Sequence, residues 1–110
     1  MSAFLGWLYA FVFTQVVEVP IYRRALGGRT LVAFGASAIT HPIVSFVFPL
    51  LHASPWVWMT AAESFAVVVE AAWIGLFGVR GVARCLGWSL LANGASFGLG
   101  MVCQGLFGWP

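Results

Sequence analysis

The sequence predicts an all-α integral membrane protein, a four-transmembrane-helix bundle with short loops and an N-out/C-out arrangement. Of the 110 residues, 62% are hydrophobic and only 7% are charged, whereas a soluble domain carries about 25% charged residues. An apolar segment of about 20 residues is long enough to cross a bilayer. The length leaves room for four such segments with short connections, so we expect residues 1–110 to form a single transmembrane domain.

Turn and cap residues divide the chain into its expected spans. Thr30 is a candidate cap for the second span, and Ser54 followed by Pro55 has the pattern of an N-cap with proline in the first helical turn. Pro42 lies inside the second span, where it would free a backbone carbonyl. The expected spans are residues 3–22, 31–51, 56–77 and 85–107.

The basic residues predict the orientation of these spans. All five are arginines, and they lie only in the first and third loops: Arg23, Arg24, Arg29, Arg80 and Arg84. Because cytoplasmic loops carry an excess of Lys and Arg, both loops are expected in the cytoplasm and both termini outside. Tyr22 is expected in the aromatic belt at the inner boundary, and Trp56 at the outer one. We therefore expect a multi-pass protein of the cell inner (cytoplasmic) membrane that binds no nucleic acid.

All three acidic residues lie inside apolar, membrane-length segments. Glu18, Glu63 and Glu70 are the only Asp or Glu in the chain, and the expected spans contain no Lys or Arg. A charge at the bilayer centre costs about 2.5–3.5 kcal/mol, so such residues usually face a protein interior and mark a functional path. The three carboxyls cannot all be paired with cations inside one chain. They must be protonated, bind a cation or pair with another chain.

Each expected span carries a polar stripe, and stripes that face lipid would lack hydrogen-bond partners. At 1.5 Å per residue, His41, Glu70 and Asn93 lie at a similar depth of about 13–15 Å from the cytoplasmic ends. Glu18 would lie on the cytoplasmic side of them and Glu63 on the outer side. The candidate ion-binding or substrate-binding residues are Glu18, His41, Glu63, Glu70 and Asn93, with Gln15, Thr40 and Ser96 as supporting polar residues.

Structural roles are the alternative for several of these residues. A single buried His is usually a satisfied core residue, and Asn93 with Ser96 is typical of interhelical hydrogen bonding, worth about 0.6 kcal/mol per contact. The chain has no phosphate-binding glycine loop, no H-E-x-x-H and no C-x-x-C. We name no catalytic residue and no cofactor. A metal site, if there is one, would use His41 and Glu70 with a second glutamate.

These observations favour a transporter or channel-like protein that handles protons or cations. An alternative is a structural or accessory subunit of a larger membrane complex, whose carboxylates pair with basic groups of other membrane subunits. A small intramembrane metalloenzyme comes third, so the chain is expected to be a non-enzyme rather than an enzyme. Besides the lipid bilayer, the expected partners are further copies of the chain or other membrane subunits.

In size, number of spans and a glutamate in the first span, the chain resembles the small multidrug-resistance exporters. It departs from them in three respects: two glutamates in the third span, the Thr40-His41-Pro42 sequence within the second, and the N-out orientation. We therefore transfer no function from this resemblance and assign no family.

Overall fold

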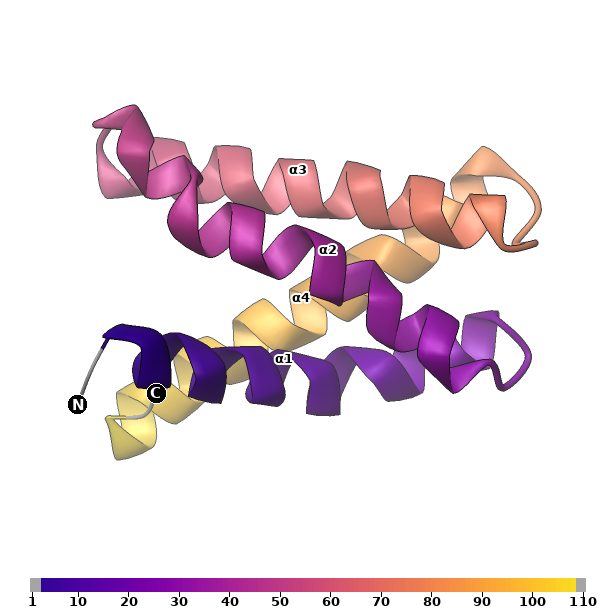
Figure 1. Cartoon of the computed structure of the whole chain (residues 1–110), viewed down its shortest axis with the longest axis horizontal. Coiled ribbons are helices and arrows are strands. Elements are labelled where there is room, and N and C mark those ends of the chain that lie inside the picture. Colours follow the sequence, from indigo (N-terminus) through magenta and orange to yellow (C-terminus); the bar gives the residue numbers. More distant parts are fainter. Residues whose placement is uncertain (1–2, 109–110) are drawn as a thin grey trace.

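The computed structural model describes residues 3–108, which form four α-helices and one short 3₁₀ helix (Figure 1). Within this range there is no β-strand. Four helical segments of the described chain are long and apolar enough to cross a membrane, and the second of them, Thr30–Leu50, combines α2 with most of the 3₁₀ helix. The prediction of an all-helical chain with four candidate transmembrane helices is therefore confirmed. The elements are α1 (Ala3–Ala25), α2 (Thr30–Phe46), η1 (Phe48–Leu51), α3 (Pro55–Leu76) and α4 (Val82–Phe107).

The four helices pack in a ring, with α1 against α2, α2 against α3, α3 against α4, and α4 against α1. Figure 1 shows both termini and the α2–α3 connection at one end of the bundle, and the two arginine-bearing loops at the opposite end. We call these the termini end and the arginine end. At the termini end, α1 and α4 diverge from α2 and α3.

The helix boundaries differ from the sequence prediction mainly in the second span. The α-helix α2 ends at Phe46, and Phe48–Leu51 form a 3₁₀ turn instead of continuing it to residue 51. Pro49 explains the change, because proline disfavours α-helical geometry in the preceding residue and lacks an N–H. Thr30 is the first residue of α2 and not its cap, which is Arg29. Ser54 does occupy the N-cap of α3, as predicted, although its side chain accepts no capping hydrogen bond.

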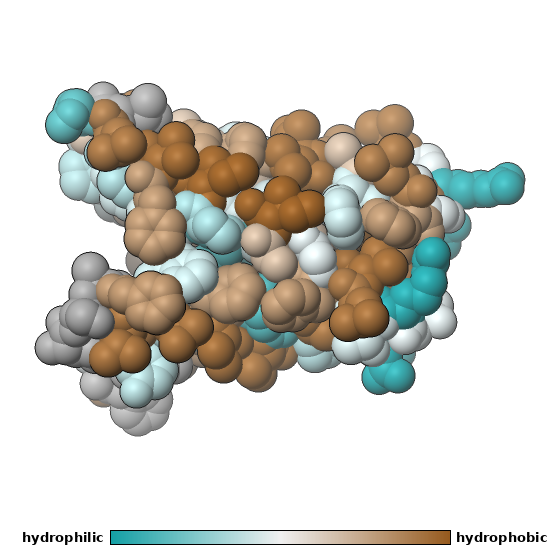
Figure 2. All heavy atoms as spheres, viewed as in Figure 1, coloured by the Kyte–Doolittle hydropathy of each residue, from teal (hydrophilic) through white to brown (hydrophobic). Residues whose placement is uncertain are grey.

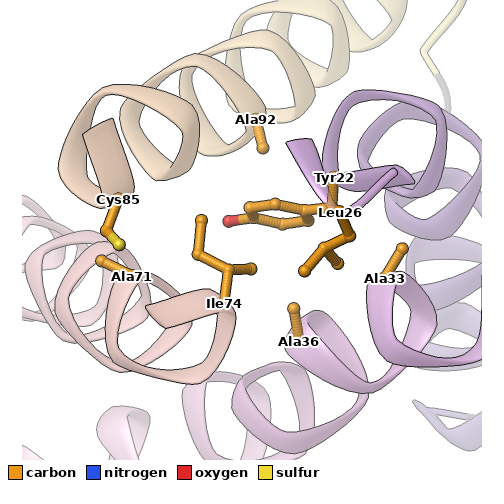
Figure 3. Packing of buried hydrophobic residues seen from close by; sticks show 8 residues of the cluster. All are labelled: Tyr22, Leu26, Ala33, Ala36, Ala71, Ile74, Cys85 and Ala92. Atoms are coloured by element: carbon orange, nitrogen blue, oxygen red, sulfur yellow. The ribbon is translucent and has the colours of Figure 1, made fainter. Parts of the chain in front are cut away.

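The apolar core lies in the half of the bundle next to the arginine end (Figure 3). Alanine dominates this cluster, and small side chains let membrane helices approach closely. Tyr22 is fully buried at its centre, so its expected place in the interfacial aromatic belt is wrong. The cluster consists of Tyr22, Leu26, Ala33, Ala36, Ala71, Ile74, Cys85 and Ala92.

Polar contacts fasten the same end. Arg29 donates hydrogen bonds to the carbonyl oxygens of Phe77 and Leu26, which joins the first loop to the end of α3. The indole Nε1 of Trp73 donates to the carbonyl of Val32 at 2.9 Å and joins α3 to α2. The arginine end is therefore closed by both packing and hydrogen bonds.

The outer surface suits a lipid environment. Large apolar side chains are exposed along all four helices. Figure 2 shows them as a brown surface over most of the bundle, with hydrophilic side chains projecting from the arginine end. This distribution is the reverse of a soluble bundle, in which the exposed face is polar.

Candidate ion or substrate site

A cavity of about 290 Å³ lies between the four helices, in the half of the bundle nearer the termini end. We call it the vestibule. Figure 2 shows the surface hollowed at this end of the molecule. The residues that line it include no Arg. Its polar lining consists of Thr14, Glu18, Ser37, Thr40, His41, Glu63, Glu70, Asn93, Ser96 and Gln104.

Glu70 is the centre of the polar network, and its side chain is 1% exposed. Its Oε1 accepts hydrogen bonds from the Tyr22 hydroxyl at 2.5 Å and from the Asn93 amide at 3.0 Å. Its Oε2 accepts one from the Thr40 hydroxyl at 2.5 Å. Each of the four helices thus contributes one of these residues. The donors to this carboxyl are all neutral groups, so none of them compensates a negative charge.

Ser89 connects this network to the backbone of α3. Its hydroxyl donates to the carbonyl of Val67 at 2.8 Å and lies 3.3 Å from both the Tyr22 hydroxyl and the Asn93 amide nitrogen. The Asn93 amide also donates to the Ser89 carbonyl, one helical turn earlier, at 2.9 Å. The groups that hold Glu70 are therefore themselves held by neighbouring polar atoms.

Glu18 lines the vestibule one turn before Tyr22 and is also 1% exposed. Its Oε2 accepts a hydrogen bond from the Ser96 hydroxyl at 2.5 Å. Its buried Oε1 has no hydrogen-bond partner among residues 3–108. Glu18 also interacts electrostatically with Glu70. The side chain is therefore anchored through Oε2, while Oε1 lacks a donor in the described chain and the carboxyl lies near that of Glu70.

Glu63 lies on α3 about two turns before Glu70, towards the termini end. It is half-buried, lines the vestibule and interacts electrostatically with Glu70. No other described side chain donates a hydrogen bond to its carboxyl. The three glutamates thus face one cavity from two helices, with Glu70 the most completely satisfied of them.

His41 lies on the vestibule wall without a hydrogen bond to Glu70. Its ring packs against Trp7 and Phe11, with centroids 5.9 and 5.4 Å away. Its buried Nδ1 has no partner in the described part of the chain. Thr40, the preceding residue, makes the contact with Glu70 instead.

Gln15 is buried on α1 but does not line the vestibule. Its side-chain amide has no hydrogen-bond partner within residues 3–108. Tyr22 is the site residue that sequence reasoning missed, because an aromatic residue before two arginines is typical of a membrane interface. Its position four residues after Glu18, on the same helical face, is the signal that could have placed it inside.

The chemistry available to this site follows from its charges. Three carboxyls face one cavity without a lysine or arginine, so the groups that could balance them are protons or bound cations. Within the described range, no group of three His, Cys, Asp or Glu side chains is placed to hold a metal ion. His41 and Glu70 therefore do not form part of such a ligand set.

Comparison of the chain with protein-family models, curated proteins and solved structures finds no match. The fold and the site define a four-helix chain with membrane-length helices and an acidic vestibule.

Proposed function

We propose that the protein is a small transporter of the cell inner membrane that moves protons or other cations through the vestibule. The observation that carries this proposal is the placement of Glu18, Glu63 and Glu70 around one cavity lined by no arginine. Unpaired carboxyls are costly in a membrane and are typical of ion paths and proton relays. A cation that enters the vestibule offsets that cost.

The closed arginine end favours a transporter over an open channel. With the arginine-bearing loops in the cytoplasm, the vestibule opens to the outside. Glu70 lies where the vestibule meets the apolar core, because Tyr22 belongs to that core and hydrogen-bonds to Glu70. Passage to the cytoplasm would require this contact to open, as in alternating access.

The carboxyls would act in sequence along the vestibule. Glu63 lies nearest the termini end and would meet the cation first. Glu18 has one oxygen without a partner and would receive the cation next to Glu70. At Glu70, a bound cation would compete with the donors Tyr22, Thr40 and Asn93. Loss of the Tyr22 hydrogen bond would then couple binding to movement at the closed end.

Flux into reconstituted vesicles tests this proposal. A pH gradient or a single added cation is applied, and transport is followed with an internal fluorescent indicator. Glu70→Gln should abolish flux, and Glu63→Gln should reduce it less. Both variants should still fold, because Gln keeps the shape and most hydrogen bonds of Glu. Cys103→Ser is the matched control, because Cys103 is a free cysteine outside the vestibule lining. Absence of proton or cation flux in the wild type would overturn the proposal.

An accessory subunit is the second candidate, and Glu63 is the residue that favours it. Its carboxyl is half-buried near the outer surface of α3 and could meet a basic group of a neighbouring subunit. Purification from native membranes in mild detergent tests this role. If it is correct, other subunits should co-purify with the wild type and be lost in Glu63→Gln. An active chain that purifies without other subunits would exclude it.

A further inference from the structure

A second concavity lies on the outer face of the bundle between α3 and α4, with a volume of about 620 Å³. We call it the α3/α4 groove. Most of its walls are apolar, among them Trp56, Val68, Leu90 and Phe97. Gly94 contributes no side chain, and a Cβ atom added there would meet nothing within 4 Å. The groove therefore faces the region that lipid chains would occupy.

The groove and the vestibule share part of their walls. The shared side chains are Met59, Glu63, Asn93 and Phe97. Asn93 is also a hydrogen-bond donor to Glu70. A molecule in the groove is consequently separated from the centre of the vestibule by a single layer of side chains.

Glu63 is the one charged residue of this groove. It lies about 12 Å from the start of α3, at 1.5 Å per residue, and so below the headgroup level. Thr60 and Ser64 are exposed beside it and line the groove with it. The Thr60 hydroxyl donates to the backbone carbonyl of Trp56 at 2.7 Å and not to Glu63. In its ionised form a carboxyl at this depth requires a counter-group, and the described chain supplies none.

We propose that the α3/α4 groove is a lateral entrance to the vestibule and that it binds a hydrophobic amine from the membrane. The apolar part of the amine lies between α3 and α4, and its ammonium group binds the Glu63 carboxylate. The role of this amine as a transport substrate rests on the proposed function, whereas its binding to the groove does not.

Electrostatics selects an amine over the other possible occupants. An apolar chain gains little by moving from lipid into an equally apolar groove. The favourable free energy must therefore come from the ammonium–carboxylate contact in a medium of low dielectric constant. A neutral amphiphile lacks this contact, and an anionic one is repelled.

Charge also argues against a second copy of the chain. All five arginines lie in the two loops of the arginine end. A copy in the same orientation would therefore place no arginine beside Glu63. A phospholipid amine is held at the headgroup level by its hydrated phosphate, so an amine without a phosphate fits the depth of Glu63 better.

Photo-crosslinking in vesicles of phosphatidylcholine tests the proposal. The probe is dodecylamine with a photoreactive diazirine in its chain, and mass spectrometry locates the crosslinks. We expect crosslinks on α3 and α4 beside the groove. Unlabelled dodecylamine should compete at least tenfold better than dodecanol or dodecanoic acid at equal membrane concentration. Equal competition by dodecanol, or by added phosphatidylethanolamine, would overturn the proposal.

Two variants distinguish the contribution of the Glu63 carboxylate to binding from that of the open space beside Gly94. Glu63→Gln should lower crosslinking at least tenfold, because the ammonium loses its counter-charge. Gly94→Leu should do the same by filling the groove. Gly87→Leu is the matched control, since Gly87 lies on the same helix, has equally open space and does not line the groove. Unchanged crosslinking in Glu63→Gln or Gly94→Leu, or crosslinks to a partner subunit seated in the groove, would overturn the proposal.

Proton and cation flux without amine is measured on the same vesicles. Flux without amine binding would reject the groove site and leave the transport proposal standing. Amine binding without flux would support the groove site and reject the transport proposal.

Discussion

The two ends of the bundle are built from the same four helices, but one end is closed by packing and the other contains the vestibule. At the arginine end, alanines let the helices approach, and Leu26, Ile74 and Tyr22 fill the remaining space. Among the residues whose burial the structure describes, the buried apolar residues outside this core are Ala62 and Ala66, both on α3. Side-chain size and polarity therefore close one half and leave the other open, because polar groups without partners cannot be packed at low cost.

Glu70 lies at the junction of these two halves. Its donor Tyr22 belongs to the closed core, whereas its own side chain lines the vestibule. The hydrogen bonds that join Tyr22 to Glu70 and Asn93 thus link the packing of one end to the chemistry of the other. Substitutions at this junction and on either side of it test how the two ends differ.

The largest expected difference between the ends is access to water-soluble reagents. Gln104 lines the vestibule and is exposed, whereas Ala36 is 1% exposed in the closed core. In a Cys103→Ser background, Gln104→Cys should react fully with a membrane-impermeant thiol reagent added outside. Ala36→Cys should not react from either side. Reaction of Gln104→Cys only from the cytoplasmic side would contradict the N-out orientation.

The sequence predicted the convergence at the centre of the site better than the local rotation of the helices. Counting residues from the expected helix ends placed Glu70 and Asn93 at a similar depth, and they do hydrogen-bond. Depth alone could not show that Thr40, not His41, faces Glu70. That choice depends on how α2 is rotated, and Trp7 and Phe11 hold the His41 ring elsewhere.

The features that sequence reasoning did not foresee depend on packing between helices. The α3/α4 groove arises because Gly94 leaves space beside α3, and the same glycine could equally mark a close helix contact. The end of α2 at Phe46 depended on Pro49, whereas Pro42 stays inside the helix. Proline in a membrane helix is tolerated when neighbouring groups satisfy the freed carbonyl, so its effect varies with surroundings.

Tyr22 should give the largest loss of stability. Tyr22→Ala removes a fully buried ring from the closed end, and comparable aromatic truncations cost about 3–5 kcal/mol. Tyr22→Phe keeps the ring and removes only the hydroxyl, so it should cost about 1 kcal/mol. The free energy of unfolding is measured by SDS titration in mixed micelles. Equal losses in the two variants would show that the ring contributes little to the closure.

Gly35→Ala tests the contact between α2 and α3 at the closed end. A Cβ atom at this position would lie 2.7 Å from the Trp73 ring, so the indole must move. Overpacking of this kind costs about 1–3 kcal/mol. Gly87→Ala, at a glycine with open space, is the control and should leave the free energy of unfolding nearly unchanged. If both variants unfold alike, the Trp73 contact does not hold the end closed.

The smallest effect separates two buried hydroxyls on α2, one helical turn apart. Thr40 donates to Glu70, whereas the Ser37 hydroxyl is buried without a partner among residues 3–108. Thr40→Val should therefore cost about 0.6–1.7 kcal/mol, the range from the average to the largest interhelical hydrogen bonds measured in a membrane protein. Ser37→Ala loses no such contact and should be neutral or slightly stabilising. SDS titration of both variants against the wild type measures the difference. A larger loss for Ser37→Ala would mean that its hydroxyl binds a group in the vestibule, which would move the centre of the site from Glu70 towards α2.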